Sequence, residues 1–138
     1  LAEMNQQLVL DEGSPNSMVL EQLFERMRGW LQADRHAVIV EHGDEVIGYM
    51  LYYQISDEYF PYQDSIYVRQ FFIQASYRRR GIGKVAFERI ANDYFPPNKA
   101  IMLDVLENNP EAKQFWLKLG FEMYNVTLRR QPVHTEGE

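Results

Sequence analysis

Residues 71–84 read FFIQASYRRRGIGK, an apolar strand that runs into a basic, glycine-punctuated turn and then opens a helix. Gly81 and Gly83 carry no side chain that would block a close approach. The first amides of the following helix have no intrahelical partners, and the helix dipole makes that end mildly positive. Four cationic side chains surround the turn, namely Arg78, Arg79, Arg80 and Lys84. We therefore predict an anion site that suits a diphosphate, with arginines able to make two-pronged contacts.

Composition limits what can surround this turn. The chain has 138 residues, of which 46% are hydrophobic, which predicts a single domain over residues 1–138 with a variable segment at 1–17 and a polar tail at 131–138. The formal net charge of -6 argues against nucleic acid as a partner. Because cysteine is absent, we expect no disulfide and no thiolate metal site. We expect no other metal site either. No apolar run approaches the roughly 20 residues that span a bilayer, so we expect a cytoplasmic protein without membrane contact.

Hydrophobic periodicity in the first half predicts one helix followed by three strands. Apolar residues recur every three or four positions over residues 18–32, the pattern of an amphipathic helix. Residues 36–42 and 45–54 alternate like strands around Gly43-Asp44, which indicates a hairpin. The run at 37–40 is continuously apolar, which predicts a central strand. A further strand is expected over residues 65–74.

The second half predicts alternating helices and strands. A helix opens at Ile82 and must stop before Pro96-Pro97. A strand is expected over residues 100–106, a helix from Pro110 to Leu119 that ends at Gly120, and a last strand over residues 121–130. This order favours a mixed sheet flanked by helices, with the anion site at the carboxyl end of a strand.

Other nucleotide motifs fit the turn less well. A Walker A loop requires glycine where Arg78 stands, and Ser or Thr where Val85 stands. The dinucleotide fingerprint is satisfied by Gly81, Gly83 and Ala86, with Asp104 about twenty residues later, but the chain is too short for the second nucleotide-binding half. A solvated, purely structural helix start is the third alternative.

A second segment, residues 103–121, reads LDVLENNPEAKQFWLKLGF. With it, the chain resembles the GNAT superfamily of N-acetyltransferases. The acetyl-CoA loop of that family is matched by Arg78, Gly81 and Gly83. Its later strand and helix are matched by a second set of residues, Leu103, Val105, Asn109, Ala112, Trp116, Gly120 and Phe121. The two motifs occur in the family's order, and the resemblance extends over residues 36–130.

The resemblance implies an α/β (α+β) fold with a mixed, mostly antiparallel sheet of about six strands flanked by helices. It also implies acetyl-CoA as cofactor and direct transfer of an acetyl group to a primary amine in a ternary complex. The pantetheine arm would pair with the backbone of Phe71, Phe72 and Ile73, as an added strand pairs with a sheet edge. The pyrophosphate would lie on residues 78–84, which include Arg79 and Ile82, and Asn109 and Trp116 would also border the cofactor.

The family's proton-transfer groups are only partly matched. Asp104 stands where some members carry a carboxylate and is the candidate base; a surface carboxylate is the alternative. Gln70 replaces an acidic residue and cannot act as a base. Trp116 stands where many relatives have a tyrosine as general acid, and an indole does not give up its proton in this range. Trp116 could hydrogen-bond the sulfur, with simple packing as the alternative. Asn109 could bond the pantetheine or the incoming amine, with capping of the next helix as the alternative.

The acceptor is indicated only by composition. Acidic and aromatic residues share the connection before residue 65, and such a surface suits a cation. The residues expected to contact the acceptor are Glu58, Tyr59, Tyr62 and Asp64. We expect an amine on a small molecule or a peptide. Two further expectations are a possible homodimer formed through residues 121–130 and, as a competing function, a CoA-binding regulatory or interaction module with weak catalysis.

Overall fold

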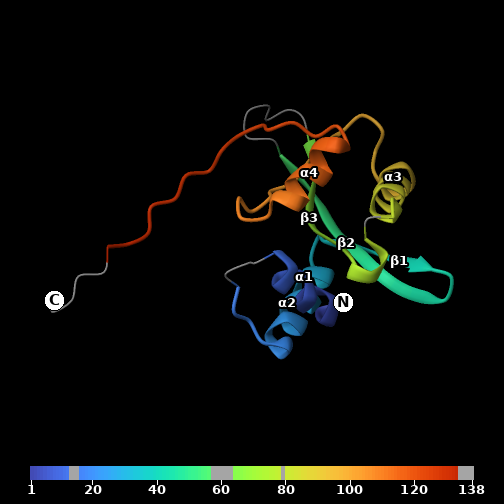
Figure 1. Cartoon of the computed structure of the whole chain (residues 1–138), viewed down its shortest axis with the longest axis horizontal. Coiled ribbons are helices and arrows are strands. Elements are labelled where there is room, and N and C mark those ends of the chain that lie inside the picture. Colours follow the sequence, from blue (N-terminus) through green and yellow to red (C-terminus); the bar gives the residue numbers. More distant parts are fainter. Residues whose placement is uncertain (13–15, 57–63, 79, 134–138) are drawn as a thin grey trace.

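The computed structural model describes residues 1–12, 16–56, 64–78 and 80–133. The described residues form four α-helices, a short 3-10 turn and one four-stranded sheet (Figure 1). In chain order the elements are α1 (Ala2–Glu12), α2 (Leu20–Gln32), β1 (His36–His42), β2 (Glu45–Ser56), β3 (Asp64–Ile73), the 3-10 turn η1 (Ala75–Tyr77), α3 (Ile82–Tyr94), β4 (Ala100–Met102) and α4 (Pro110–Lys118).

The sheet is mixed, and its strands follow the order β1-β2-β3-β4. The first two pairs are antiparallel, whereas β3 and β4 are parallel. Gly43 adopts a left-handed φ of 64° at the turn between β1 and β2, as the predicted hairpin requires. The prediction of a central strand at 37–40 is wrong, because β1 lies at the edge of the sheet and Ile39 is 42% exposed. An apolar run by itself does not reveal how many partners a strand has.

The described residues contain four strands rather than the predicted six or so. β4 stops at Met102 instead of Leu106, and residues 121–133 form no strand. Figure 1 shows this C-terminal segment running away from the rest of the molecule, and Leu128 is 90% exposed. A strand exists only where a second strand supplies hydrogen bonds, and none of the described strands pairs with this segment.

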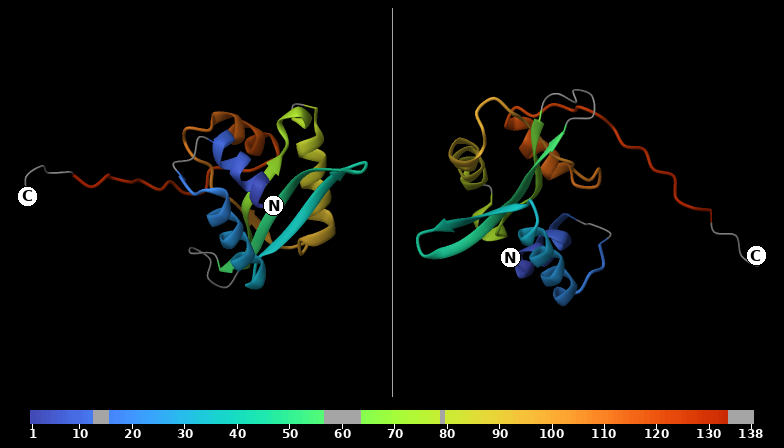
Figure 2. Two further views of the ribbon diagram at one scale, coloured as in Figure 1. Left: turned by 90° about the horizontal axis from the view of Figure 1, so that it is seen from below. Right: turned by 180° about the vertical axis from the view of Figure 1, so that it is seen from behind.

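Helix α1 was not predicted, because its buried positions do not form an ordinary apolar stripe. Its buried residues are Ala2, Asn5 and Leu8, and the fully buried Asn5 interrupts the pattern that sequence reading depends on. Figure 2 shows α1 and α2 side by side, and α1 contacts β3 while α2 contacts β1.

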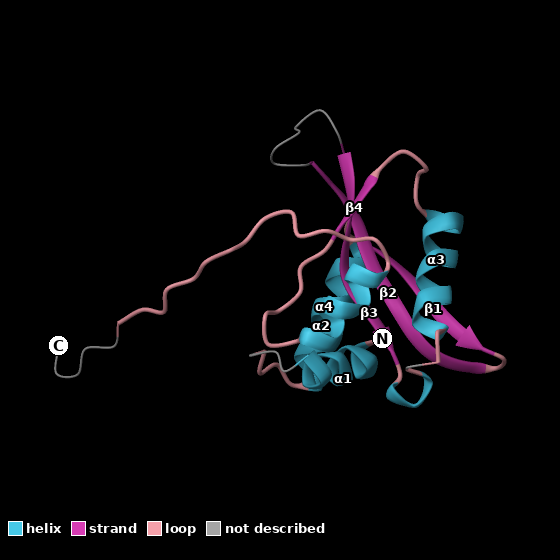
Figure 3. Ribbon diagram, turned by 45° about the horizontal axis from the view of Figure 1, so that its top comes forward, coloured by secondary structure: helices cyan, strands magenta, loops and turns pink. Residues whose placement is uncertain are grey.

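Two hydrophobic clusters occupy the two faces of β2 and β3. Alternate side chains of a strand point to opposite faces, so Met50 belongs to one cluster while Tyr49 and Leu51 belong to the other. The first cluster is completed by α3 and α4, and the second by α1 and α2. Figure 3 shows α3 on one side of the strands and α1 and α2 on the other. The segment of β3 from Arg69 to Ile73 is therefore bordered by both clusters.

Candidate active site

The glycine turn forms the start of α3, as the sequence predicts. Gly81 has a left-handed φ of 76° and precedes the first helical residue, Ile82. A residue with a side chain is strained in this conformation. The amides of Ile82, Gly83 and Lys84 belong to the first turn, where no intrahelical carbonyl is available to them. Arg80 and Lys84 are exposed beside them, and Arg79 lies outside the described residues.

Arg78, the first arginine of the turn, is already bonded within the protein. Its Nε donates to the carbonyl oxygen of Ile73 at 2.6 Å, and its Nη2 donates to a carboxylate oxygen of Asp11 on α1. Its guanidinium also lies 5.5 Å from the ring centroid of Phe72. Arg78 thus ties the turn to β3 and α1 with two of its five N–H donors, and the other donors of the guanidinium are the ones that a phosphate could use.

The edge of β3 that faces away from β2 is partly open. Phe72 pairs with Tyr49, and the amide of Gln74 donates to Ile47 at 2.7 Å. Because antiparallel pairs alternate in their bonding, the backbone groups of Phe71 and Ile73 point away from β2. On that outer side β4 pairs only with Ser65, Ile66 and Tyr67. Among the described strands, none covers β3 beyond that point.

An irregularity in β3 lies just before this open edge. Leu51 pairs with Gln70 and Tyr52 with Val68, which leaves Arg69 as an additional residue on β3. Such a bulge bends the strand and redirects its side chains, and bulges often adjoin active sites. The bulge, the open edge and the start of α3 follow one another within a few residues of chain. This arrangement can hold an extended, polar ligand with an anionic end at α3.

Aromatic side chains close the space next to the open edge. We use the term aromatic cluster for Phe71, Phe87, Phe115, Trp116 and Phe121. Trp116 is 9% exposed and lies 4.9–5.7 Å, between ring centroids, from each of the other four. A Cβ on Gly83 would lie 3.2 Å from the Phe115 ring. The structure thus shows the packing of Trp116, and it brings α4 against the start of α3.

Asp104 lies just beyond β4 and is exposed. Its carboxylate accepts a hydrogen bond from the hydroxyl of Tyr67 on β3. Burial, followed by this hydrogen bond, raises the pKa of Tyr67 above its ordinary value. Tyr67 therefore stays protonated at neutral pH and acts as a donor that orients the carboxylate. Sequence reasoning missed Tyr67, since nothing local links residues 37 positions apart.

The structure also places four other residues that the sequence analysis singled out. The side-chain oxygen of Gln70 accepts from the Tyr49 hydroxyl at 2.7 Å in a buried position. Asn109 caps α4 by accepting from the amide of Ala112 at 3.3 Å, so the capping alternative is present. Phe72 and Ile73 are 3% and 6% exposed, so their side chains pack in the core and only their backbone can serve a ligand.

Of the residues predicted to contact the acceptor, only Asp64 belongs to the described part of the chain, and it does not lie at the open edge. Glu58, Tyr59 and Tyr62 lie outside the described residues. Asp64 opens β3, seven residues and about 20 Å before Phe71. Its carboxylate accepts from Gln54 at 2.6 Å and lies 3.8 Å from the Lys99 ammonium.

No helix in the described part of the chain is both long enough and apolar enough to cross a bilayer.

The sequence matches the acetyltransferase (GNAT) family over residues 3–121. The chain belongs to the GNAT family. Its β1-β2-β3 order, with antiparallel pairs, also differs from the parallel sheet that a dinucleotide fingerprint requires. A search of curated proteins found no match.

Solved structures share the GNAT fold of this chain at low sequence identity. A possible acetyltransferase from Clostridium difficile 630 is 18% identical, with a TM-score of 0.75 and coverage of 97% of this chain and 90% of that one. An acetyltransferase from Clostridium acetobutylicum, described as predicted and solved with acetyl-CoA, is 15% identical, with a TM-score of 0.71 over 94% and 86% of the two chains. The aminoglycoside N-acetyltransferase AAC(6')-Iy in complex with CoA is 19% identical, with a TM-score of 0.71 over 96% and 86%.

Proposed function

We propose that this GNAT protein is an acetyl-CoA-dependent N-acetyltransferase that transfers the acetyl group directly to a primary amine in a ternary complex. The observation that carries the proposal is the juxtaposition of the open edge of β3 with the uncapped start of α3. Two of the similar structures contain acetyl-CoA or CoA, which supports the cofactor. Acetyl-CoA supplies an activated acetyl group as a thioester.

The residues present fit this cofactor. The backbone groups of Phe71 and the amide of Ile73 would pair with the pantetheine amides along the open edge. The amides of Ile82, Gly83 and Lys84, with the Arg80 and Lys84 side chains, would hold the pyrophosphate. Arg78 keeps the turn in place through its bonds to Ile73 and Asp11. The aromatic cluster excludes water from the space beside the edge.

Proton transfer falls to Asp104. An amine with a pKa near 10 is mostly protonated at neutral pH, so a proton must leave before the nitrogen can attack. Asp104 is exposed and is oriented by Tyr67, so it can take this proton directly or through water. Formation of the new C–N bond would break the C–S bond of the thioester, and CoA would leave as the thiolate. Its ordinary pKa of about 8.5 makes a dedicated acid unnecessary, consistent with Trp116 in the usual tyrosine position.

A CoA-binding module with weak catalysis is the second candidate. It is favoured by the packing of Trp116 and by the hydrogen bond that occupies Gln70. Release of free thiol from acetyl-CoA, measured across a panel of primary amines, tests the first candidate. Turnover that Asp104→Asn reduces at least tenfold, with unchanged acetyl-CoA affinity, is the expected result. Tight acetyl-CoA binding by calorimetry without thiol release from any amine would favour the module.

The acceptor contacts at Glu58, Tyr59, Tyr62 and Asp64 and the homodimer remain part of the proposal. Exposed apolar residues alternate along the C-terminal segment at Val126 and Leu128, a pattern that suits pairing with a second chain. Light scattering over a range of protein concentrations tests the dimer, and a mass of one chain throughout would contradict it.

A further inference from the structure

A polar pocket lies between α1, α2 and β3. Its polar side chains include Asn5, Arg26, Arg69 and Gln70, and none of the described residues that line it is acidic. We use the term polar pocket for the site lined by these four residues. The cavity measures about 60 Å³, which accommodates a group the size of a carboxylate, because one water needs roughly 10–15 Å³.

Two donors in the polar pocket are buried without a partner in the described part of the chain. Asn5 is fully buried, and its Oδ1 accepts from Arg26 Nη2 at 3.1 Å. Its Nδ2 has no hydrogen-bond partner, and neither does Arg26 Nε. Buried donors are almost always satisfied in native proteins, so both atoms indicate that an acceptor group belongs here.

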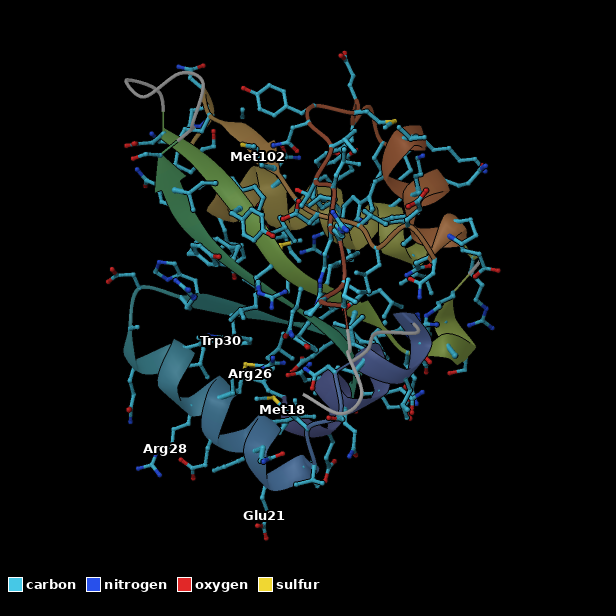
Figure 4. The ribbon with its side chains drawn as sticks, turned by 90° about the vertical axis from the view of Figure 1, so that its left-hand side faces the viewer. Met18, Glu21, Arg26, Arg28, Trp30 and Met102 are labelled. Atoms are coloured by element: carbon cyan, nitrogen blue, oxygen red, sulfur yellow. The ribbon has the colours of Figure 1, made fainter. Side chains whose placement is uncertain are left out.

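The polar pocket also holds two positive charges close together. The guanidinium groups of Arg26 and Arg69 lie 4.5 and 5.6 Å from the ring centroid of Trp30. Burial and then the charge of Arg69 lower the pKa of Arg26. A bound anion would offset both effects, because an opposite charge nearby favours the protonated guanidinium. Figure 4 shows Arg26 and Trp30 on the side of α2 that faces the sheet, whereas Glu21 and Arg28 point outward.

The polar pocket adjoins the open edge of β3. Arg69 is the additional residue of the bulge, and Gln70 immediately precedes Phe71. An anionic group bound here would place the atoms attached to it next to that edge. We propose that the polar pocket binds the carboxylate of the acceptor, so that the substrate class is a small amine that also bears a carboxylate. This inference rests on the proposed acetyl transfer and names its acceptor.

Acceptor kinetics with matched amines test this inference. Glycine, β-alanine and 4-aminobutyrate vary the distance between amine and carboxylate, and the amide of each acid removes the charge. We expect the best acid to show a kcat/KM at least tenfold above that of its amide. Arg26→Gln and Arg69→Gln should raise the KM for the acid at least tenfold, while the KM values for the amide and for acetyl-CoA stay unchanged. Arg28→Gln, at an outward position of the same helix, is the control.

Direct binding keeps the test independent of turnover. Thermal-shift titrations without acetyl-CoA should show that the preferred acid raises the Tm of the wild type and of Arg28→Gln, but not that of Arg26→Gln or Arg69→Gln. Arg69 is exposed, so its variant should fold even if Arg26→Gln does not. Equal use of acids and amides, or no protection by any acid, overturns the inference. Protection by inorganic phosphate and 2-aminoethyl phosphate alone also overturns it, in favour of a phosphate-bearing acceptor.

The two proposals fail differently. Turnover of uncharged amines with no effect of the arginine variants would leave the acetyltransferase intact and remove the carboxylate pocket. Absence of acetyl-CoA binding would remove the acetyltransferase, whereas protection by a carboxylate that depends on Arg26 would still support the pocket.

Discussion

The aromatic cluster and the polar pocket adjoin the same short stretch of β3, yet they are built from opposite chemistry. The aromatic cluster is a set of interlocking rings around Trp116. The polar pocket contains two guanidinium groups and two buried donors that have no partner among the described residues. Tight apolar packing stabilises a fold by itself, whereas unpaired buried donors cost stability unless a ligand satisfies them. The difference suggests that the aromatic side holds the strand edge in shape and that the polar side selects what comes to it.

Truncation in the aromatic cluster should have the largest effect. Trp116→Ala removes contacts with four rings, and we expect it to lower the free energy of unfolding by about 3–5 kcal/mol. Trp116→Phe keeps a ring in place and should cost clearly less. Urea denaturation followed by circular dichroism measures both. If the free energy of unfolding of Trp116→Ala lies within about 1 kcal/mol of the wild-type value, the aromatic cluster does not hold α4 against β3.

The charge beside the start of α3 comes next. Arg80→Ala should weaken acetyl-CoA binding by about 1–3 kcal/mol, the range for a lost hydrogen bond to a charged group. Arg89→Ala, at an exposed position later on α3, should leave it unchanged. Isothermal titration calorimetry gives both affinities, and equal affinities for the two variants would contradict the phosphate assignment.

A carboxylate introduced into the polar pocket by substitution should pair with its arginines and replace the bound anion. Asn5→Asp places a charge of the right sign beside Arg26 with almost no change in volume, and we expect a gain of about 1 kcal/mol in stability. Protection by carboxylates should disappear at the same time. Gln6→Glu adds the same negative charge to the same helix but outside the polar pocket. It therefore shows how much of the stability change comes from the helix dipole and not from the charge beside Arg26. Stability that falls with Asn5→Asp and is unaffected by Gln6→Glu would contradict the view that the pocket lacks an anion.

The smallest effect is expected at the Tyr67–Asp104 pair, outside both regions. Removing the hydroxyl with Tyr67→Phe should cost about 1 kcal/mol near neutral pH. Because folding raises the pKa of Tyr67 above its ordinary value near 10, the associated stability is fully present below pH 10 and is lost as the pH rises further. Tyr67→Phe should therefore lose less stability than the wild type above pH 10.

Tyr52 also contributes to the loss of stability at alkaline pH, because burial raises its pKa as well. Tyr52→Phe serves as the comparison variant. Thermal melts between pH 8 and 11 provide the measurement. An identical fall in Tm with rising pH for the wild type and Tyr67→Phe would contradict the Tyr67–Asp104 hydrogen bond.

Much of the local structure could be predicted from the sequence. The helix of residues 20–32, the hairpin at Gly43 and the helix that opens at Ile82 after Gly81 depend on neighbouring residues, whose periodicity and turn chemistry act over a few positions. The predictions that failed depended on distant partners. The apolar run at 37–40 could not show that β1 is an edge strand, and residues 121–130 could not show that none of the described strands pairs with them.

The candidate site divides along the same line. The glycine-rich start of α3 and the family itself were readable from two contiguous motifs, because each motif supplies its own chemistry within one turn or one helix. Only the tertiary structure showed that Arg78 is bonded to Asp11, that Tyr67 holds Asp104, and that Asn5 and Arg26 share a pocket with Arg69. These relations join residues far apart in the chain, and side chains that meet through folding leave no local signal. The sequence alone therefore determined the glycine turn and the uncapped helix start that follows it, whereas the packing of α1 and α2 against β3 decided which side chains gather in the polar pocket.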